Sequence, residues 1–275
     1  MTSKFITANI ILIVTGFIIF SCPPAQQINS SQCVEQTETE NSPVEKVEIP
    51  AKISGRQEQI ISHTGYTVSY NSDWKIPNWA AYELTKVETE GIVPRSNTFL
   101  PDPDVAYEHS ATTSDYKNSG WDRGHMVPSG DMKWSEQAMK ESFYLSNICP
   151  QNNNLNSGVW KNLEEQVRGL ASQKGKLYVV CGPIVSEQPQ TIGLNKVAIP
   201  DAFFKALLQN DNGKWSAIAF LFTNESGRKP LSTYALTVED IQQITGIDFF
   251  PALPDSIEHE IESQIDFTAW NIKTQ

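Results

Sequence analysis

The stretch that decides the fold has three parts: DYKNSGWDRGHMVP at residues 115–128, FYLSNICPQ at 143–151, and LNSGVWKNLEEQVR at 155–168. The first part places His125 directly after an arginine and a glycine. The third part places Asn156 ahead of a helical pattern that carries a carboxylate and a guanidinium. A base, a neutral oxygen ligand, an acid and cations are the groups needed for metal-assisted chemistry on a phosphate ester.

His125 is the first candidate catalytic residue. Histidine suits general-base chemistry because its unperturbed pKa lies close to neutral pH. Gly124 allows a close approach of the backbone, and the guanidinium of Arg123 offers paired N–H groups to phosphate oxygens. The alternative is a structural histidine in the core, satisfied by a hydrogen bond. The run from Asp122 to His125, together with the downstream asparagines, favours the catalytic role.

Asn156 is the candidate metal ligand. Mg²⁺ is a hard cation that prefers oxygen and keeps most of its waters, so one amide oxygen can hold it and leave room for a substrate phosphate. Mn²⁺ is the alternative ion. The other interpretation of Asn156 is a helix cap, because asparagine is favoured directly before a helix. The pattern predicts that this helix opens at Ser157 or Gly158.

Glu164 and Arg168 lie four residues apart, on one face of the predicted helix. They form either a surface ion pair, or a carboxylate that orients water around a metal and a guanidinium that binds substrate phosphate. Glu165 competes with Glu164 for the carboxylate role. Arg95 lies in a polar loop and is a further candidate for contact with phosphate.

Three motifs in this stretch resemble the DNA/RNA non-specific endonucleases, which belong to the ββα-metal group of nucleases. They are Asp-Arg-Gly-His at 122–125, Asn-x-x-Pro-Gln at 147–151 and Asn-x-x-x-Trp-x-x-Leu-Glu at 156–164. Shorter matches extend the resemblance over about residues 60–255. The resemblance implies an α+β fold, in which a central antiparallel sheet is flanked by helices and carries a ββα-metal (His-Me finger) motif.

The resemblance also implies a role for each candidate residue. His125 is the general base, Asn156 binds Mg²⁺, and Glu164 fixes the waters around the metal. Asn147 orients the histidine, and the alternative is that it only makes hydrogen bonds within its loop. The phosphate contacts come from Arg95, Arg123 and Arg168. The implied reaction is hydrolysis of phosphodiester bonds in DNA and/or RNA with little sequence preference, because contacts to the backbone carry no base identity.

The charge of the chain departs from what such an enzyme usually presents. The formal net charge is −11, whereas attraction to phosphate favours basic surfaces. Much of the acidity lies at the C-terminal end, where the residues from Thr237 to Gln275 include eight acidic side chains and one lysine. The charge therefore argues against tight general binding of nucleic acid and suggests an enzyme that needs its metal to hold the substrate.

Residues 1–21 are predicted to be an export signal. Lys4 gives a positive start, and the apolar run from Ile10 to Phe20 is shorter than the roughly 20 residues of a membrane-spanning helix. Cys22 follows a small residue, as in the cleavage site of bacterial lipoproteins, and is the predicted lipidation site. The alternative is an ordinary signal peptide or a membrane anchor. The protein is expected to be exported and tethered to a membrane, in the periplasm or at the cell surface.

Composition and periodicity divide the rest of the chain into two parts. Residues 22–59 are rich in Pro, Ser, Gln, Thr and Glu and are predicted to be a flexible tether. Residues 60–275 are predicted to be one nuclease domain. The alternation of apolar residues predicts strands at 66–70, 80–84, 143–148, 177–181, 203–209 and 215–222, a turn at 73–79, and helices at 135–142 and 237–245.

Cys149 and Cys181 each lie at the end of an apolar run. Outside the cytosol they could form a disulfide if their strands are neighbours, and otherwise they are two small buried thiols. The pattern leaves both alternatives open, and it leaves open whether the chain forms a homodimer.

Two other functions compete with the endonuclease. One is a catalytically inactive lipoprotein of the same fold that binds nucleic acid or protein, and the intact set of His125, Asn156 and Glu164 argues against it. The other is a phosphodiesterase that acts on small substrates, which the sequence alone does not separate from an endonuclease.

Overall fold

The computed structural model describes residues 46–272. The predicted export signal, the predicted lipidation site Cys22 and the first part of the predicted tether lie outside the described residues. Within 46–272, no helix combines the length and the apolar character needed to cross a membrane.

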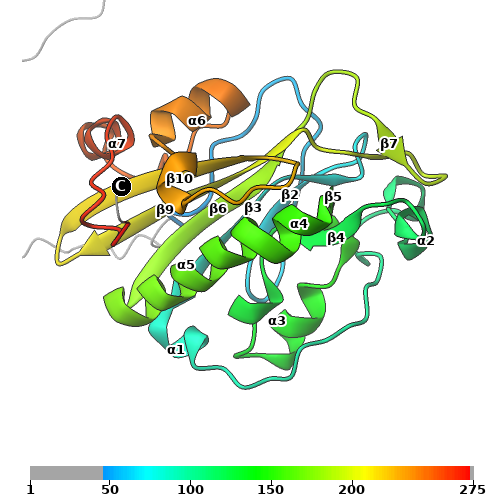
Figure 1. The fold of residues 1–275 in the computed structure, drawn as a ribbon, viewed down its shortest axis with the longest axis horizontal. Helices are drawn as coiled ribbons and strands as arrows, with labels where there is room; N and C mark the ends of the chain where they lie inside the picture. The colour runs from blue at the N-terminus through cyan, green and yellow to red at the C-terminus, as the bar shows by residue number, and fades with distance from the viewer. Residues whose placement is uncertain (1–45, 273–275) are drawn as a thin grey trace, which may run out of the picture. The chain divides into compact units, whose positions relative to one another are not determined.

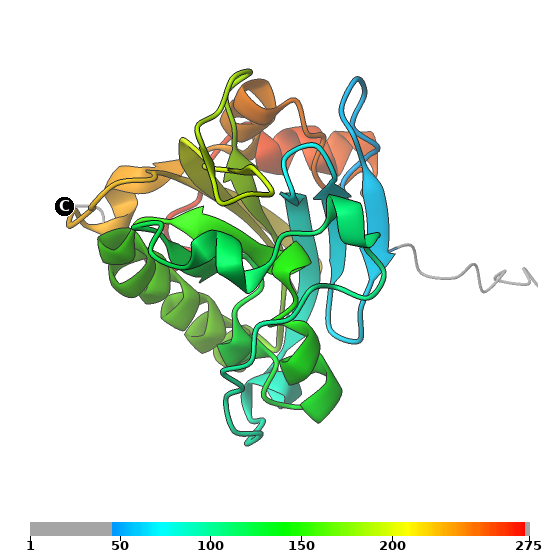
Figure 2. The ribbon, with the colours of Figure 1, turned by 90° about the vertical axis from the view of Figure 1, so that its right-hand side faces the viewer.

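A seven-stranded antiparallel sheet forms the centre of the fold, in the order β1-β2-β3-β6-β9-β10-β11. Its strands are β1 (Gln59–Ser62), β2 (Thr67–Asn71), β3 (Ile76–Thr85), β6 (Lys176–Ile184), β9 (Ala202–Asp211), β10 (Lys214–Thr223) and β11 (Ala235–Leu236). Figure 2 shows the blue and cyan N-terminal strands at one end of this sheet and the yellow and orange strands towards the other. The sheet and its helices confirm the predicted α+β class.

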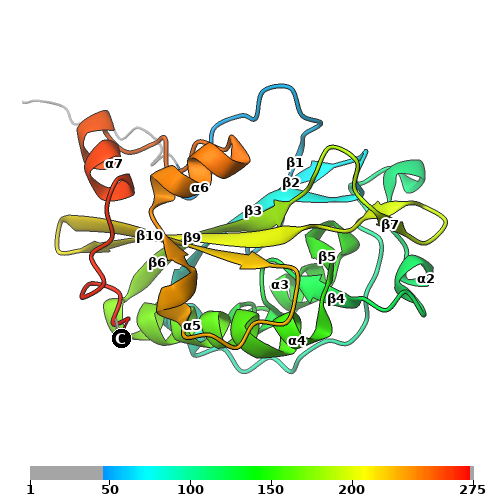
Figure 3. The ribbon, with the colours of Figure 1, turned by 45° about the horizontal axis from the view of Figure 1, so that its top comes forward.

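Helices cover both faces of the sheet (Figure 1 and Figure 3). The long helix α5 (Lys161–Lys174) lies along one face, and α6 (Val238–Thr245) and α7 (Asp255–Glu262) cover the other. The buried apolar side chains accordingly form two clusters, one against α5 and one against α6 and α7. The shorter helices are α1 (Lys86–Thr89), η1 (Tyr107–His109), α2 (Thr113–Tyr116), η2 (Ser129–Asp131), α3 (Glu136–Glu141), η3 (Leu145–Asn147), α4 (Asn153–Leu155), η4 (Asn156–Trp160) and η5 (Leu231–Tyr234).

Several local predictions are confirmed because the local signals are strong. The β9–β10 hairpin turns at Asn212 and Gly213, whose positive φ values of 53° and 91° suit asparagine and glycine. Thr237 caps α6, since its hydroxyl accepts a hydrogen bond of 3.0 Å from the backbone N–H of Asp240. Ser135 caps α3 in the same way through Ala138, at 3.3 Å.

Three local predictions are wrong. The run at 143–148 is mostly the helical turn η3, and the strand β5 (Ile148–Gln151) begins where the predicted strand ends. The predicted turn at 73–79 is wrong in its second half, because β3 already begins at Ile76. The site helix begins earlier than predicted, at α4, and is interrupted by a π-helical segment in which Gly158 departs from helical geometry.

The boundary between tether and domain also requires correction. Residues 46–59 were predicted to be flexible, but Glu48 and Ile53 are buried against the domain. The backbone N–H of Ala51 donates a hydrogen bond of 3.0 Å to the carbonyl of Asp248. The polar composition of this segment does not indicate that these two side chains are buried. Because they are, the folded part begins well before residue 60.

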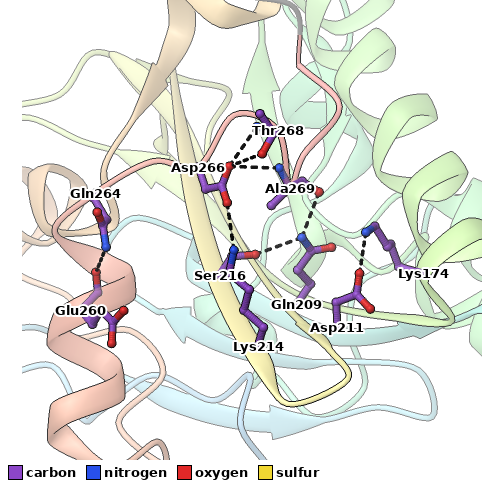
Figure 4. Close-up of polar contacts among 10 residues, drawn as sticks. All are labelled: Lys174, Gln209, Asp211, Lys214, Ser216, Glu260, Gln264, Asp266, Thr268 and Ala269. Carbon is purple, nitrogen blue, oxygen red and sulfur yellow. Dashed lines mark hydrogen bonds and ion pairs between the residues drawn. The ribbon is translucent and has the colours of Figure 1, made fainter.

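The C-terminal segment is packed onto the β9–β10 hairpin, as the close-up in Figure 4 shows. Gln209 donates hydrogen bonds to the hydroxyl of Ser216 at 2.9 Å and to the carbonyl of Ala269 at 3.0 Å. Asp266 forms an ion pair of 3.3 Å with Lys214. The indole of Trp270 is buried in the cluster beneath α5. These contacts attach the chain beyond α7 to the same domain.

Candidate active site

One cavity of about 450 Å³ brings the predicted site residues together. Six of the seven residues proposed for catalysis, phosphate contact and metal binding line it, namely Arg95, Arg123, His125, Asn156, Glu164 and Arg168. The remaining wall comes from Pro128, Ser129, Gly130, Ser157 and Lys161. Asn147 is the one predicted site residue that does not line the cavity.

The β4–β5 hairpin positions His125. Strand β4 (Asp122–His125) pairs with β5 so that Gly124 lies opposite Cys149 and His125 lies opposite Ile148. A Cβ atom on Gly124 would lie 2.2 Å from Oε1 of Gln151, which is buried beneath it. Only glycine fits this contact, so the residue before the histidine is fixed by packing against β5.

The imidazole of His125 is held between aromatic rings. Its ring centroid lies 4.8 Å from that of Phe143, in an edge-on arrangement, and 5.4 Å from that of Phe99. The residue is 8% exposed, and its Nε2 atom has no hydrogen-bond partner among residues 46–272. Burial, together with the positive charges of Arg95 and Arg123, lowers the pKa of His125 to about 3. The imidazole is therefore neutral at physiological pH.

Arg95 and Arg123 flank the histidine on the same aromatic wall. The guanidinium carbon of Arg95 lies 5.0 Å from the ring centroid of Phe143, and that of Arg123 lies 4.2 Å from the centroid of Phe99. Arg95 also donates a hydrogen bond to the hydroxyl of Ser129. Stacking on rings leaves guanidinium N–H groups free at the edge, which suits contact with phosphate oxygens.

Asn147 acts on the backbone rather than on the imidazole. Its amide nitrogen donates hydrogen bonds of 2.9 Å to the carbonyls of Val127 and Ser142. Its amide oxygen accepts a hydrogen bond of 2.9 Å from the N–H of Val127. These are the hydrogen bonds of the alternative interpretation, in which Asn147 fixes the loop, and they hold the main chain two residues after His125.

Asn156 is not the helix cap. The cap of α4 is Asn152, whose side-chain oxygen accepts hydrogen bonds from Asn154 and Leu155 at 3.0 and 3.3 Å. The amide nitrogen of Asn156 instead donates a hydrogen bond of 2.9 Å to Oδ2 of Asp122. This bond fixes the amide so that its Oδ1 atom is left without a donor among the described residues.

The donor set fits a single hard divalent cation. Oδ1 of Asn156 is a neutral oxygen at the cavity wall, and Mg²⁺ and Mn²⁺ both accept such ligands. Within residues 46–272, no group of three His, Cys, Asp or Glu side chains is arranged to hold a metal ion. An ion in this cavity would therefore be held by one amide oxygen and would keep most of its waters.

Glu164 lies on the first turn of α5, at the floor of the cavity. Burial raises the pKa of its carboxyl to about 7, and the positive charge of Lys205 is the largest influence in the opposite direction. The surface ion pair with Arg168 does not form, because Arg168 pairs with Asp131 instead. Glu165 is exposed and pairs with Lys161 at 3.6 Å, which removes it as a rival.

Arg168 is tied to a buried carboxylate. Its guanidinium donates to Oδ1 of Asp131, and the hydroxyl of Tyr82 donates to Oδ2 of the same residue at 2.8 Å. Asp131 is fully buried, whereas the Arg168 side chain is 25% exposed. The carboxylate of Asp131 thus neutralises part of the charge of Arg168, while the exposed part of the Arg168 side chain lines the cavity.

The sequence model of the DNA/RNA non-specific endonuclease family matches residues 42–256. The chain belongs to this family. It is 34% identical over 233 residues to the mitochondrial nuclease EXOG of Xenopus laevis, covering 78% of this chain and 63% of that relative. It is 32% identical over 207 residues to human mitochondrial endonuclease G, covering 70% of each. The match covers 63% of the length of EXOG from Xenopus laevis and 56% of the length of EXOG from Homo sapiens. The chain therefore spans less than two thirds of the length of these relatives.

A solved structure agrees with this family assignment. The crystal structure of the EndoG/EndoGI complex, which concerns EndoG inhibition, matches with a TM-score of 0.70 and 27% sequence identity. The match covers 77% of this chain and 91% of that one. The ββα-metal fold predicted from the three motifs is therefore confirmed.

Sequence reasoning missed several contributors to this endonuclease-family site. Asp131 and Ser129, which hold Arg168 and Arg95, lie directly after the Asp-Arg-Gly-His motif. Their short distance from the motif was the available signal, but neither residue type indicates that its side chain binds an arginine of the cavity. The sequence favours an anchoring role for Asp122 in its turn, whereas in the structure Oδ2 of Asp122 accepts a hydrogen bond from the amide nitrogen of Asn156.

The two candidate disulfide cysteines are free thiols. Cys149 and Cys181 are both buried, and Sγ of Cys181 lies 3.1 Å from the carbonyl oxygen of Met126. Burial raises the pKa of the Cys181 thiol to about 11, so it stays protonated. Of the two alternatives that the sequence left open, the structure shows the pair of buried thiols.

A second cavity adjoins the first and extends it. It has a volume of about 490 Å³ and shares Arg123 and Asn156 with the first cavity. Its other lining residues are Phe99, Thr113, Tyr116, Lys117, Trp121 and Asp122. The two cavities therefore meet at Arg123 and Asn156.

Proposed function

We propose that the chain is a metal-dependent endonuclease that hydrolyses phosphodiester bonds in DNA and/or RNA with little sequence preference. Mg²⁺ is the proposed cofactor, and Mn²⁺ is the alternative. The observation that carries the proposal is one cavity lined by the imidazole of His125, the amide of Asn156 and three arginines. Membership of the non-specific endonuclease family supports the same reaction.

His125 is the proposed general base. Its imidazole is neutral at physiological pH, and it has a ring nitrogen without a partner among the described residues. It takes a proton from water as the water oxygen attacks phosphorus. Phe99 and Phe143 hold the ring plane, and Asn147 holds the backbone that follows, so the base is fixed before substrate arrives.

The other cavity residues bind and neutralise the phosphate. Arg95 and Arg123 offer N–H groups to its oxygens and offset the negative charge that grows during attack. Arg168 does the same with the exposed part of its guanidinium. When bound at Asn156, a divalent ion supplies Lewis-acid polarisation of the phosphoryl group and stabilises the leaving oxygen. Glu164 orients water at the cavity floor through its carboxylate.

Backbone recognition supports the low sequence preference. The charged groups of the cavity are suited to phosphate oxygens, which carry no base identity. The first cavity meets the second cavity, where Lys117 and Trp121 could contact a flanking nucleotide. A substrate longer than a single nucleotide therefore fits the surface better than a small phosphodiester does.

Digestion of plasmid DNA and of RNA tests the proposal. His125→Ala is expected to lower the rate about 10²- to 10⁴-fold, the range of general-base catalysis, and EDTA is expected to abolish activity that Mg²⁺ restores. His109→Ala is the matched control, because that histidine is exposed and outside the cavity. Activity that survives His125→Ala would reject the base, and activity in EDTA would reject the metal. A folded wild type without any activity would favour the inactive binding protein of the same fold.

The N-terminal predictions form a separate part of the proposal. We propose that Cys22 carries a lipid and that the exported domain is held at a membrane, in the periplasm or at the cell surface. The support is the short apolar run that ends in a small residue before Cys22. Labelling with palmitate in a bacterial host, compared between wild type and Cys22→Ala, tests it. Equal labelling of the two proteins would reject the lipidation site.

A further inference from the structure

Lys205 occupies a position where the fold calls for an apolar residue. It lies in the middle of β9, between Phe203 and Leu207, which are the next residues on the same face of the strand. Both of those neighbours belong to the core cluster that packs against α5. Lys205 is 0% exposed, so its whole side chain, including the ammonium group, is inside the protein.

The surroundings of the ammonium group offer it little hydrogen bonding. Nζ has no hydrogen-bond partner among residues 46–272. Nζ lies 4.6 Å from the ring centroid of Trp160, the residue directly before α5. The residues opposite Lys205 on the neighbouring strands are Cys181 and Phe220. A cation in such a place is strongly disfavoured unless an opposite charge compensates it.

Two carboxyl groups can supply that compensation. The positive charge of Lys205 lowers the pKa of Glu164 and of Asp131, in each case against burial, which raises the pKa. Asp131 already accepts from Arg168 and from Tyr82, one on each oxygen. Glu164 is therefore the carboxylate with the greater need of a counter-charge, and it is the one that lines the cavity.

The ionisable groups that influence the pKa of Glu164 lie on four other elements and on α5 itself. Trp160 and Glu164 lie four residues apart and so on one face of the helical run, and the ammonium group lies over the Trp160 ring. Lys205 and Glu164 are therefore both neighbours of Trp160, the first through its ammonium group and the second along the helix. The charged or titratable neighbours are Lys205 on β9, Asp131 on η2, Arg168 on α5, Tyr82 on β3 and Cys181 on β6.

We propose that Lys205 is a positioning residue for Glu164: its buried ammonium group, packed on the ring of Trp160, is the counter-charge for the carboxylate that lines the cavity. This inference rests on the proposed function, in which Glu164 orients water at the cavity floor. Lys205 acts on Glu164 through its charge, from a central strand, and it is not among the residues that line the cavity. The lysine itself touches neither substrate nor metal.

The role as a counter-charge explains why a lysine, and not an apolar residue, occupies this core position of β9. An apolar residue of the same length would fill the space beneath Trp160 without the penalty of a desolvated charge. Replacement of Lys205 by methionine is therefore expected to keep the packing and to remove only the charge. If Lys205 were purely structural, the variant would keep its turnover number.

The test compares steady-state kinetics of plasmid cleavage for Lys205→Met, Glu164→Gln, the double variant and wild type, with folding checked by circular dichroism and thermal unfolding. Lys205→Met is expected to lower kcat about 10- to 100-fold with little change in KM, as loss of a supporting partner does. In the Glu164→Gln background the same change is expected to alter kcat less than about 3-fold, because the two residues act together. Lys214→Met, at an exposed lysine on β10, is the matched control.

Each outcome decides the question. A folded Lys205→Met protein with wild-type kcat overturns the proposal, and so does a loss of the same size in both backgrounds. If Lys205→Met fails to fold while the double variant folds, the ammonium group is needed because of the carboxylate, which supports it. If neither variant folds, the lysine serves folding alone and the proposal is wrong. A fully active Glu164→Gln protein would instead remove Glu164 from the proposed mechanism, so the two failures are distinguishable.

Discussion

The amide nitrogen of Asn156 donates a hydrogen bond of 2.9 Å to Oδ2 of Asp122, across 34 positions of sequence. Asp122 begins the strand that ends in His125, and Asn156 opens the helical segment on the opposite side of the cavity. One hydrogen bond thus ties the strand of the proposed base to the helical segment of the proposed metal ligand. It also determines which end of the Asn156 amide faces the cavity.

Removal of that hydrogen bond is expected to weaken metal binding. In Asp122→Ala the amide of Asn156 can rotate, so its oxygen is no longer fixed towards the cavity. The Mg²⁺ concentration that gives half-maximal activity is expected to rise about 10-fold or more, with activity largely recovered at saturating metal. Mg²⁺ titration of the cleavage rate measures it. Asn153→Ala removes the exposed second donor to Asp122 and serves as the control. An unchanged metal requirement in Asp122→Ala would contradict the prediction.

Gly124→Ala is expected to damage both stability and activity. The new methyl group would lie 2.2 Å from Oε1 and 2.6 Å from Cβ of Gln151, so β4 and β5 would have to separate. A loss of about 2–3 kcal/mol in the free energy of unfolding is expected, as for overpacking in a core. Urea denaturation measures it. Gly169→Ala, on α5 with no atom within 4 Å of the new Cβ, is the control and should be neutral or slightly stabilising. Equal stability of the two variants would refute the steric argument.

Local signals in the sequence predicted much of the fold. The strands of the β9–β10 hairpin and the helices that follow Ser135 and Thr237 each depend on neighbouring residues, and each lies close to where the pattern placed it. The run at 143–148 shows the limit of this reasoning. Its apolar residues are buried as expected, yet they form a helical turn, because burial alone does not distinguish a short strand from a turn.

The site shows the same division. The motifs predicted which polar residues share the cavity, because each motif carries its own chemistry. They did not predict how the residues are held. Asp131 pairs with Arg168 across 37 positions, and Lys205 reaches the helix from the central sheet. The tertiary fold brings such partners together, and their spacing in the sequence does not predict the contact.

Replacement of Arg168 and replacement of Arg95 are expected to differ in their effect on the free energy of unfolding. Arg168→Ala leaves the carboxylate of Asp131 buried without its cation, which costs about 3–5 kcal/mol when one member of a buried pair is removed. Arg95→Ala removes only an arginine that stacks on Phe143 and bonds Ser129, so its unfolding free energy should change by about 1 kcal/mol or less. Chemical denaturation compares them, and both variants should cleave DNA more slowly. Similar stability of the two variants would show that Asp131 does not depend on Arg168.

A buried carboxyl group on α7 makes stability depend on pH at a distance from the cavity. Glu262 is 6% exposed, and its Oε2 accepts a hydrogen bond of 2.8 Å from Gln242 on α6. Burial, together with the negative charges of Glu258, Asp248 and Glu239, raises the pKa of Glu262 from 4.5 to about 8. The folded protein therefore keeps this proton over a range in which the unfolded chain has already released it.

The sign of the effect follows from that difference. Above pH 4.5 the unfolded chain gains stability by ionising Glu262, so the contribution of this group to folding falls steadily until about pH 8. Glu262→Gln cannot ionise and keeps an oxygen that accepts from Gln242. It is expected to raise the free energy of unfolding by roughly 1–3 kcal/mol at pH 8 and to change it little at pH 4.5. Thermal unfolding from pH 4.5 to pH 8.5 measures the difference, with the exposed Glu260→Gln as control. A gain of equal size at both ends of that range would show that folding does not raise the pKa of Glu262.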